Sequence, residues 1–310
     1  MSDTINTYYR SLLDSHDQKV YDDLMNQSMH YGSYIMTDIP HTDVAKIMDA
    51  VRNDIPLMFY VKYISFYYRV QGAKLSIKID YLYPKEQARQ LLDECRQWGK
   101  YIIGNMPSNI NEQQRLLWLH DVLLQNVTYG DTNGFQAHNI IGVIKDKIAV
   151  CEGISRAYKF LCDIAGIPCI CVSGTLSGEN HMWNMVWIAN GTSFLDVTSD
   201  LPQSSSDQKR FNFLRSSAEM YNYDWDRNII PECQIRNKQD IAIHAKDINE
   251  LLEICRKNCN TDSLSIYLDF GRRLSRDELS EIIKMLFYQN IIPFSKNAYY
   301  STDTQTIYFN

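Results

Sequence analysis

The chain lacks the long apolar runs and the basic clusters that are typical of membrane and nucleic-acid proteins. No apolar stretch is uninterrupted for the roughly 20 residues that a membrane-spanning helix needs. The first residues have neither the basic start nor the apolar core of a signal peptide. With 31 Lys and Arg against 37 Asp and Glu, the net charge is −6, and no run is basic enough to form a local nucleic-acid patch. We therefore expect a cytoplasmic protein without a membrane or nucleic-acid partner.

Paired cysteine motifs are also missing. No two of the eight cysteines are spaced as C-x-x-C, and without a secretion signal they are expected to be free thiols. Cys162, Cys169, Cys171 and His181 can be imagined together as zinc ligands. Their spacing matches no usual zinc module, however, and Cys162 lies on an apolar helix face. We expect no metal and no cofactor.

Length and composition set the scale of the fold. With 310 residues, of which 45% are hydrophobic and 22% charged, the chain can bury a substantial core. Shifts in the sequence pattern divide it into four parts. These are a helix and strand region (1–104), a catalytic region (105–202), a linker or packing segment (203–240) and a small α+β unit (241–310). The sequence does not indicate an oligomeric state.

Helical periodicity and runs of aromatic and β-branched residues predict the elements of the two flanking regions. The short break at Gln71 and Gly72 lies between two such runs and predicts a hairpin. Helices are expected over residues 16–27, 41–52, 84–103, 246–259 and 275–288, with strands at 264–270 and 304–309.

A helix that starts at Cys151 is the feature on which the central region depends. From Ile154 to Ala165 apolar residues recur at intervals of three and four, which predicts one apolar face, and Gly166 then ends the helix. A thiol at a helix N-terminus faces unpaired backbone N–H groups and the positive end of the helix dipole, and both favour the thiolate. Because the thiolate is the nucleophilic form, Cys151 is a candidate nucleophile. The alternative is that Cys151 is one more small, buried apolar residue, as free cysteines usually are.

A scaffold helix is expected ahead of this one. Asn109 and Glu112, three residues apart, form a capping-box pattern in front of a run of leucines. His120 lies on this helix without an obvious partner, so we interpret it as a surface or satisfied histidine rather than a ligand.

Three strands are expected after the cysteine helix, at 167–176, 181–189 and 192–198. The second strand begins with His181 and the third carries Asp196. A helix with cysteine at its N-terminus, followed by antiparallel strands with histidine and aspartate, can bring three distant residues into one site.

Three blocks of sequence carry a family resemblance. AVCEGISRAYKFLCDIAGIPC, HMWNMVWIANG and FLDVTSD, in this order, resemble the transglutaminase-like family, a branch of the papain-like cysteine enzymes. The resemblance covers about residues 109–200. It implies an α+β core in which the nucleophile helix packs on an antiparallel sheet. It also implies that Cys151 is the nucleophile, His181 the general base and acid, and Asp196 the residue that orients His181.

The sequence departs from the family pattern at two positions. Met182 and Ser199 stand where the family often has a small residue and a tryptophan. Both departures are expected to change the wall of the site and to leave the triad as it is.

Other side chains are weaker site candidates. The backbone N–H of Cys151 is the first candidate oxyanion donor, and Gln136, His138 or Asn139 could supply the second. Each of these three is equally typical of an ordinary loop. Trp183 could shield a thioester from water, although a tryptophan on a half-buried strand is more often a core residue.

The choice of orienting carboxylate depends on the strand register. A tight hairpin at Asn190 and Gly191 places Asp200 opposite His181, and it displaces Asp196 by roughly 13 Å along the strand. We expect Asp196 to orient His181, because a shift in register is a modest requirement. Asp200 remains the rival, and otherwise it is a solvated carboxylate at a strand end.

The residues and the resemblance together predict a cysteine-dependent acyl-transfer enzyme that acts on amide bonds of a protein or peptide, as a protease, deamidase or transglutaminase. One alternative is an inactive peptide- or protein-binding module on the same fold, with the aromatic N-terminal region holding the peptide. Another is a structural or regulatory protein. The intact set of three residues argues against both, because binding alone requires none of them.

Overall fold

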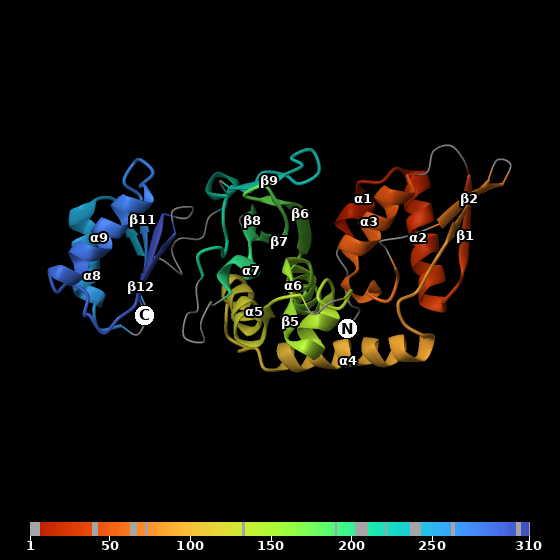
Figure 1. Ribbon diagram of the computed structural model, residues 1–310, viewed down its shortest axis with the longest axis horizontal. Helices are drawn as coiled ribbons and strands as arrows, with labels where there is room; N and C mark the ends of the chain where they lie inside the picture. The colour runs from red at the N-terminus through yellow and green to blue at the C-terminus, as the bar shows by residue number, and fades with distance from the viewer. Residues whose placement is uncertain are drawn as a thin grey trace.

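The computed structural model describes residues 7–38, 43–62, 67–71, 74–131, 134–189, 191–201, 210–220, 222–235, 243–261, 264–301 and 305–309. Figure 1 shows three bodies in chain order: an N-terminal region, a central unit and a C-terminal unit. Helices and largely antiparallel sheets occur together, so the predicted α+β class is confirmed. Within these ranges no helix has the length and apolarity required to cross a membrane.

The N-terminal region combines helices with a three-stranded antiparallel sheet in the order β1-β3-β2. Strands β2 and β3 pair from Tyr67 with Lys78 to Gln71 with Lys74, as the predicted hairpin requires. The turn of this hairpin, with Gly72, lies outside the described residues. The elements are α1 (Tyr8–Ser11), α2 (Ser15–His30), β1 (Tyr34–Asp38), α3 (Val44–Asp54), η1 (Pro56–Met58), β2 (Tyr67–Gln71) and β3 (Lys74–Lys78).

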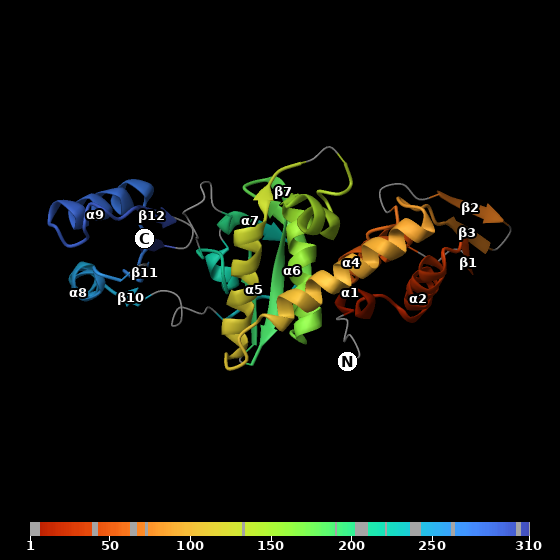
Figure 2. The ribbon, with the colours of Figure 1, turned by 90° about the horizontal axis from the view of Figure 1, so that it is seen from below.

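Helix α4 (Lys85–Gly104) joins the N-terminal region to the central unit and runs from one to the other in both views (Figures 1 and 2). It crosses helix α6 (Cys151–Ala165) at Gly99, where an added Cβ would lie 2.3 Å from Ile164 Cδ1. The neighbouring Trp98 stacks on Phe160, with ring centroids 6.3 Å apart. One apolar core therefore continues from the N-terminal helices into the central unit. The domain boundary near residue 104 stays a prediction.

The central unit contains a four-stranded antiparallel sheet in the order β8-β7-β6-β9. Cys169, Val186 and Leu195 on one face share a core with α6. Trp183, Met185 and Phe194 on the other face share a core with Met220, Tyr223, Trp225, Ile230 and Cys233. The elements are α5 (Glu112–Asn126), β4 (Thr128–Tyr129), η2 (Gly142–Asp146), β5 (Ile148–Ala149), α6, β6 (Cys169–Leu176), β7 (Glu179–Ile188), β8 (Gly191–Leu195), α7 (Val197–Asp200), η3 (Ser217–Glu219) and β9 (Tyr223–Trp225).

Helix α6 begins and ends where the sequence predicts. Cys151 is its first residue, and Gly166 follows its end with φ +70°, the left-handed conformation that favours glycine. Helix α5 packs against it, and Tyr158 Oη donates a hydrogen bond to Leu116 O at 3.0 Å. The predicted cap of α5 is wrong by two residues. The capping box is formed by Asn111 and Gln114 instead of Asn109 and Glu112, and α5 begins at Glu112.

The C-terminal unit has its own apolar core, formed by residues between Ala245 and Phe309. Its sheet has the order β10-β11-β13-β12, and Phe211 of the central unit contacts Tyr308 with ring centroids 6.2 Å apart. The helices and strands predicted here are present. They are β10 (Ile243–Ala245), α8 (Ile248–Asn258), β11 (Leu264–Leu268), α9 (Arg276–Tyr288), β12 (Ala298–Ser301) and β13 (Thr306–Phe309).

Candidate functional site

Cys151 lies at the exposed end of α6, against the loop that precedes it. Val150 has extended backbone, and its N–H donates to Ala137 O at 3.1 Å. Gly153 is required by the same loop, because an added Cβ would lie 2.4 Å from Ala137 O. Cys151 is half-buried, and of the other seven free cysteines only Cys259 is also accessible. A reagent or substrate can therefore reach the Cys151 thiol.

His181, at the start of β7, is paired with Asp196. Its Nε2 lies 2.7 Å from Asp196 Oδ2, and the two side chains are 10% and 1% exposed. A carboxylate can only accept, so Nε2 donates and Nδ1 is left to face the thiol. Burial lowers the pKa of His181, but hydrogen bonds to Asp196 and Cys151 outweigh it and raise the pKa to about 10. The structure thus brings Cys151, His181 and Asp196 together.

The β7–β8 hairpin has a different register from the expected one. The expected pairing places Ala189 opposite Thr192, whereas Ile188 faces Gly191 and Asn184 faces Leu195 in the structure. Gly191 is the first residue of β8, with φ +135°, and an added Cβ would lie 2.9 Å from Ile235 Cδ1. The glycine is therefore needed in the strand rather than in the turn. The turn position Asn190 lies outside the described residues.

This register brings Asp196 to His181 without a longer loop. Continuing the pairing by one residue beyond β8 puts Asp196 opposite Trp183, on the same face as His181 and two residues from it. The displacement along the strand falls from roughly 13 Å to about 7 Å, which the two side chains span. Asp196 then ends the strand and caps α7, accepting from Ser199 N at 3.1 Å.

Asp196 is held by more groups than the sequence indicates. Its Oδ2 accepts hydrogen bonds from Ser199 Oγ at 2.6 Å and Tyr223 Oη at 2.8 Å, in addition to His181. Burial raises the pKa of Asp196, but these hydrogen bonds and the charge on His181 outweigh it and lower the pKa. The expectation that Ser199 only changes the wall of the site is wrong, because it contacts the carboxylate directly. Tyr223, on β9, was not among the sequence candidates.

Asp200 forms a second histidine–aspartate pair, away from His181. Its Oδ2 lies 3.1 Å from His120 Nε2 on α5, and both side chains are fully buried. Asn212 N donates to the same carboxylate at 3.0 Å. His120 is thus a buried histidine with a partner, as one of the two interpretations expected, whereas the interpretation of Asp200 as a solvated carboxylate is wrong. The pair instead ties the end of α7, which carries Asp196 at its start, to α5.

Trp183 and Met182 are buried residues that follow His181 on β7. Trp183 has no exposed surface, so it does not shield a thioester from solvent. Its ring stacks beside His181, with centroids 6.1 Å apart at an interplanar angle of 20°, and contacts Tyr223 edge to face. Met182 is also buried, and its carbonyl accepts from Ser155 Oγ at 2.9 Å.

The three candidates for the second oxyanion donor have other partners. His138 Nδ1 is 3.0 Å from Glu152 Oε2, and Gln136 forms a side-chain hydrogen bond with Tyr83. Asn139 is buried, donates to Phe135 O at 2.5 Å and accepts from the backbone of its own loop. These contacts hold the loop that packs on Cys151, and the second donor stays unassigned.

Tyr129 is a further residue near the thiol. Its strand β4 pairs with β5, which places Tyr129 opposite Ala149, two residues before Cys151. Burial and the charges of Cys151, Asp131 and Asp196 raise the pKa of Tyr129, although 57% of the residue is exposed. Within the described ranges no cluster of three or more histidine, cysteine or acidic side chains could hold a metal ion.

One family model and several solved structures are similar to part of this chain. Residues 82–198 match the family model described as the transglutaminase-like superfamily. Similar solved structures include one of a TGase (12% identity, 57% of this chain and 53% of that chain, TM-score 0.34) and the periplasmic domain of TgpA from Pseudomonas aeruginosa (13%, 40% and 53%, 0.27). The aligned part thus spans about half the length of each. No curated protein matches the chain in sequence. Residues 82–198, less than half of the chain, are thus similar to the transglutaminase-like superfamily.

Proposed function

We propose that this protein is a cysteine-dependent acyl-transfer enzyme that acts on amide bonds of a protein or peptide. The observation that carries the proposal is the pair of His181 and Asp196, 2.7 Å apart, with Cys151 hydrogen-bonded to His181 at the start of α6. A thiolate beside an imidazolium that a buried carboxylate orients is the arrangement that nucleophilic catalysis at an amide requires.

The residues perform the reaction in two steps. The Cys151 thiolate forms a bond to the amide carbonyl carbon, and His181 protonates the amine as the C–N bond breaks, which leaves a thioester. Water or a second amine then attacks the thioester, while His181 accepts its proton and the thiolate leaves. The N–H of Cys151 has no partner within its helix, so it can donate to the oxyanion in both steps.

Selective alkylation tests the proposal. With iodoacetamide at neutral pH, Cys151 is expected to react far faster than Cys259, the other accessible cysteine, because only Cys151 has an imidazolium beside it. Labelling is located by peptide mass spectrometry, and Cys151→Ala is the control that must lose the fast phase. Equal rates at the two cysteines would contradict the proposal.

The acyl acceptor and the substrate require a separate screen. The protein is incubated with a proteome, with and without an added primary amine, and Cys151→Ala is run in parallel. New peptide termini identify hydrolysis of the chain, a shift from glutamine to glutamate identifies deamidation, and an amine adduct identifies transfer. A cytoplasmic location and a protein or peptide partner stay parts of this proposal.

The rate should depend on pH as a bell. Since His181 has its pKa raised to about 10, it stays protonated over the neutral range, and the alkaline limb should fall near pH 10 as it loses the proton that the leaving amine needs. Both limbs of the bell belong to the coupled pair of Cys151 and His181. The profile of kcat/KM from pH 5 to 11 measures this. A rate that only climbs with pH would show that the ion pair does not form.

Tyr223 should contribute through Asp196. In Tyr223→Phe the carboxylate loses one of the three hydrogen bonds to Oδ2, and we expect kcat to fall about tenfold without loss of the fold. Tyr158→Phe is the matched control, because Tyr158 is also buried but donates to a backbone carbonyl outside the site. A similar loss in both variants would assign the effect to general packing.

A further inference from the structure

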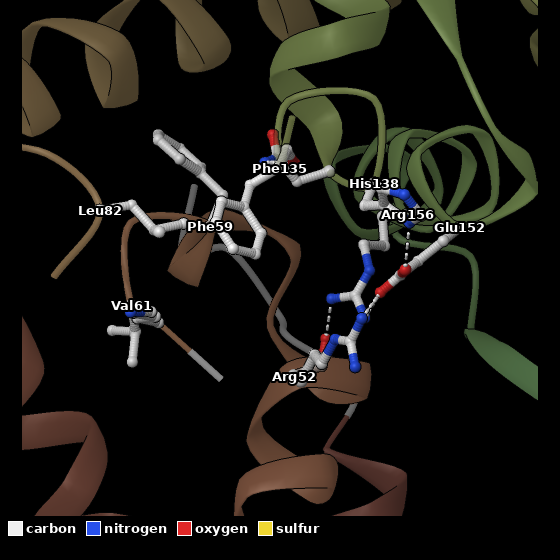
Figure 3. Close-up of a pocket in the computed structure, with 10 residues that line it drawn as sticks. Arg52, Phe59, Val61, Leu82, Phe135, His138, Glu152 and Arg156 are labelled. Atoms are coloured by element: carbon white, nitrogen blue, oxygen red, sulfur yellow. Dashed lines mark hydrogen bonds and ion pairs between the residues drawn. The ribbon is translucent and has the colours of Figure 1, made fainter. Parts of the chain in front are cut away.

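A small pocket lies between the N-terminal region and the loop that packs on the start of α6. Figure 3 shows its labelled side chains, which come from the end of α3, the segment after η1, the segment between β3 and α4, the loop ahead of η2, and α6. The proposed chemistry does not use this pocket. It is lined by Arg52, Phe59, Val61, Lys62, Leu82, Phe135, His138, Asn139, Glu152 and Arg156.

Glu152, the one carboxylate among the described lining residues, already has three side-chain partners. Glu152 Oε1 accepts from Arg52 and, at 2.9 Å, from Arg156 Nη2, while Oε2 lies 3.0 Å from His138 Nδ1. Burial raises the pKa of Glu152, but the charges of Arg156 and Arg52 outweigh it and lower the pKa. Glu152 is therefore ionised at neutral pH and has little capacity for a further donor.

Arg156 is left with an unused donor. Its side chain is only 6% exposed, and two of its nitrogens are bound, Nη2 by Glu152 and Nη1 by the carbonyl of Arg52. Nε is buried and has no hydrogen-bond partner among the described residues. A buried guanidinium N–H without an acceptor is costly, so this position favours a ligand that supplies an acceptor.

The pocket also has an excess of positive charge. Arg52, Lys62 and Arg156 line it, against Glu152 in the lining and Asp49, one turn before Arg52, whose carboxyl feels the charges of both arginines. The three basic side chains exceed the two carboxylates by one positive charge, without counting His138. Such a balance fits a single negative charge better than a dianion.

The other side of the pocket is apolar. Phe59 and Val61 are buried, Phe135 is 41% exposed, and Leu82 lies beside them. In Figure 3 the side chains of Phe59, Leu82 and Phe135 lie apart from the group of Arg52, Glu152 and Arg156. A ligand that fills the pocket therefore needs an apolar part as well as an anionic part.

The pocket is close to the reacting thiol. Glu152 follows Cys151 directly, and the loop with His138 and Asn139 packs on the first turn of α6 through Val150 and Gly153. The pocket therefore lies beside the first turn of α6, the helix that begins at Cys151.

We propose that this pocket is a substrate subsite that binds a carboxylate next to an apolar side chain, with Arg156 Nε and Lys62 as the donors. The inference rests on the proposed function and adds a substrate class to it: peptides with an acidic residue beside an apolar one, close to the reacting amide. The carboxylate can belong to an aspartate or glutamate side chain or to the end of a peptide chain.

Peptide binding to the full-length Cys151→Ala protein tests the subsite without turnover. The first set consists of fluorescent heptapeptides with an alanine background and an amidated C-terminus, in which Phe-Glu or Phe-Gln is placed at each position in turn. A second set carries Phe-Ala and has a free C-terminal carboxylate. Anisotropy should show about tenfold tighter binding of the best Phe-Glu peptide than of its Phe-Gln partner. Tight binding confined to the second set would assign the site to chain ends.

Charge variants locate the preference. In Lys62→Gln the tenfold ratio of affinities between Phe-Glu and Phe-Gln peptides should fall to near unity. In Lys62→Glu the preference should reverse, so that Phe-Lys peptides bind more tightly than Phe-Glu peptides. Lys100→Gln is the matched control, because Lys100 is exposed on α4 and does not line the pocket. Phe135→Ala should weaken both members of a pair alike. The substituted positions are exposed or half-buried. Arg156 is left unchanged, because its side chain is buried and its replacement could unfold the protein.

Two results would overturn the subsite. One is an equal affinity for all acidic and amide peptides, and the other is an acidic preference that survives in Lys62→Glu. Peptide binding does not require the thiol. Failure of the alkylation test would therefore contradict the proposed enzyme activity and leave the binding preference for acidic peptides unaffected.

Discussion

Cys151→Ser is expected to lower turnover by at least about a thousandfold, a rise in barrier of about 4 kcal/mol. A serine hydroxyl must lose its proton during the attack, whereas a thiol beside His181 can be ionised in advance. Cys151 itself helps to raise the pKa of His181 to about 10, so the wild-type pair carries the proton on His181 before the attack. The site is thus arranged for a thiolate and an imidazolium, and serine removes the nucleophile without supplying a base.

The measurement is kcat/KM on a substrate found in the proteome screen, with the free energy of unfolding measured in parallel. Cys259→Ser is the matched control, because Cys259 is also accessible but lies outside the site. Turnover of Cys151→Ser within about tenfold of the wild type, less than about 1.4 kcal/mol in barrier, would refute the thioester mechanism.

Local patterns made much of the fold predictable from the sequence. The limits of α6 follow from the apolar periodicity after Cys151 and from Gly166, whose φ of +70° needs no distant contact to explain it. Ser275 caps α9 through a capping box with Glu278, which are only three residues apart. Such features depend on neighbours in the chain, and a sequence contains them in full.

The parts that the sequence did not predict depend on contacts between distant segments. Gly191 was expected in a turn, but it lies in β8, where Ile235 leaves no room for a Cβ. Tyr223 reaches Asp196 because β9 pairs with β6, with Leu176 opposite Tyr223. The stretch near residue 223 is rich in tyrosine and tryptophan, but nothing local indicates which carboxylate such a tyrosine meets.

The separate roles of the two aspartates lead to opposite expectations for Asp196→Asn and Asp200→Asn. In Asp196→Asn the charge that holds His181 protonated is lost, and an amide NH2 must face at least one of the donors that now contact the carboxylate. We expect kcat to fall at least about a hundredfold. Since Asp196 raises the pKa of His181, the alkaline limb should also move to lower pH.

In Asp200→Asn the reaction is expected to continue within a few-fold of the wild-type rate at a temperature where the protein stays folded. Asp200 contacts His120 and Asn212, and no contact joins it to His181 among the described residues. Loss of this buried pair should lower the free energy of unfolding by about 2 to 4 kcal/mol, because the fully buried His120 loses the carboxylate that it contacts.

Denaturant unfolding followed by circular dichroism, together with the pH profile of kcat, separates the two aspartates. Asp196→Asn should change the profile and also lower the stability, because its carboxylate is buried and hydrogen-bonded too, whereas Asp200→Asn should lower the stability and leave the profile unchanged. His120→Gln is the companion variant for the second pair, and it should lose stability as Asp200→Asn does. If Asp200→Asn lost turnover while Asp196→Asn kept a normal rate and a normal alkaline limb, Asp200 would be the orienting carboxylate. The hydrogen bond between His181 and Asp196 would then have no part in catalysis.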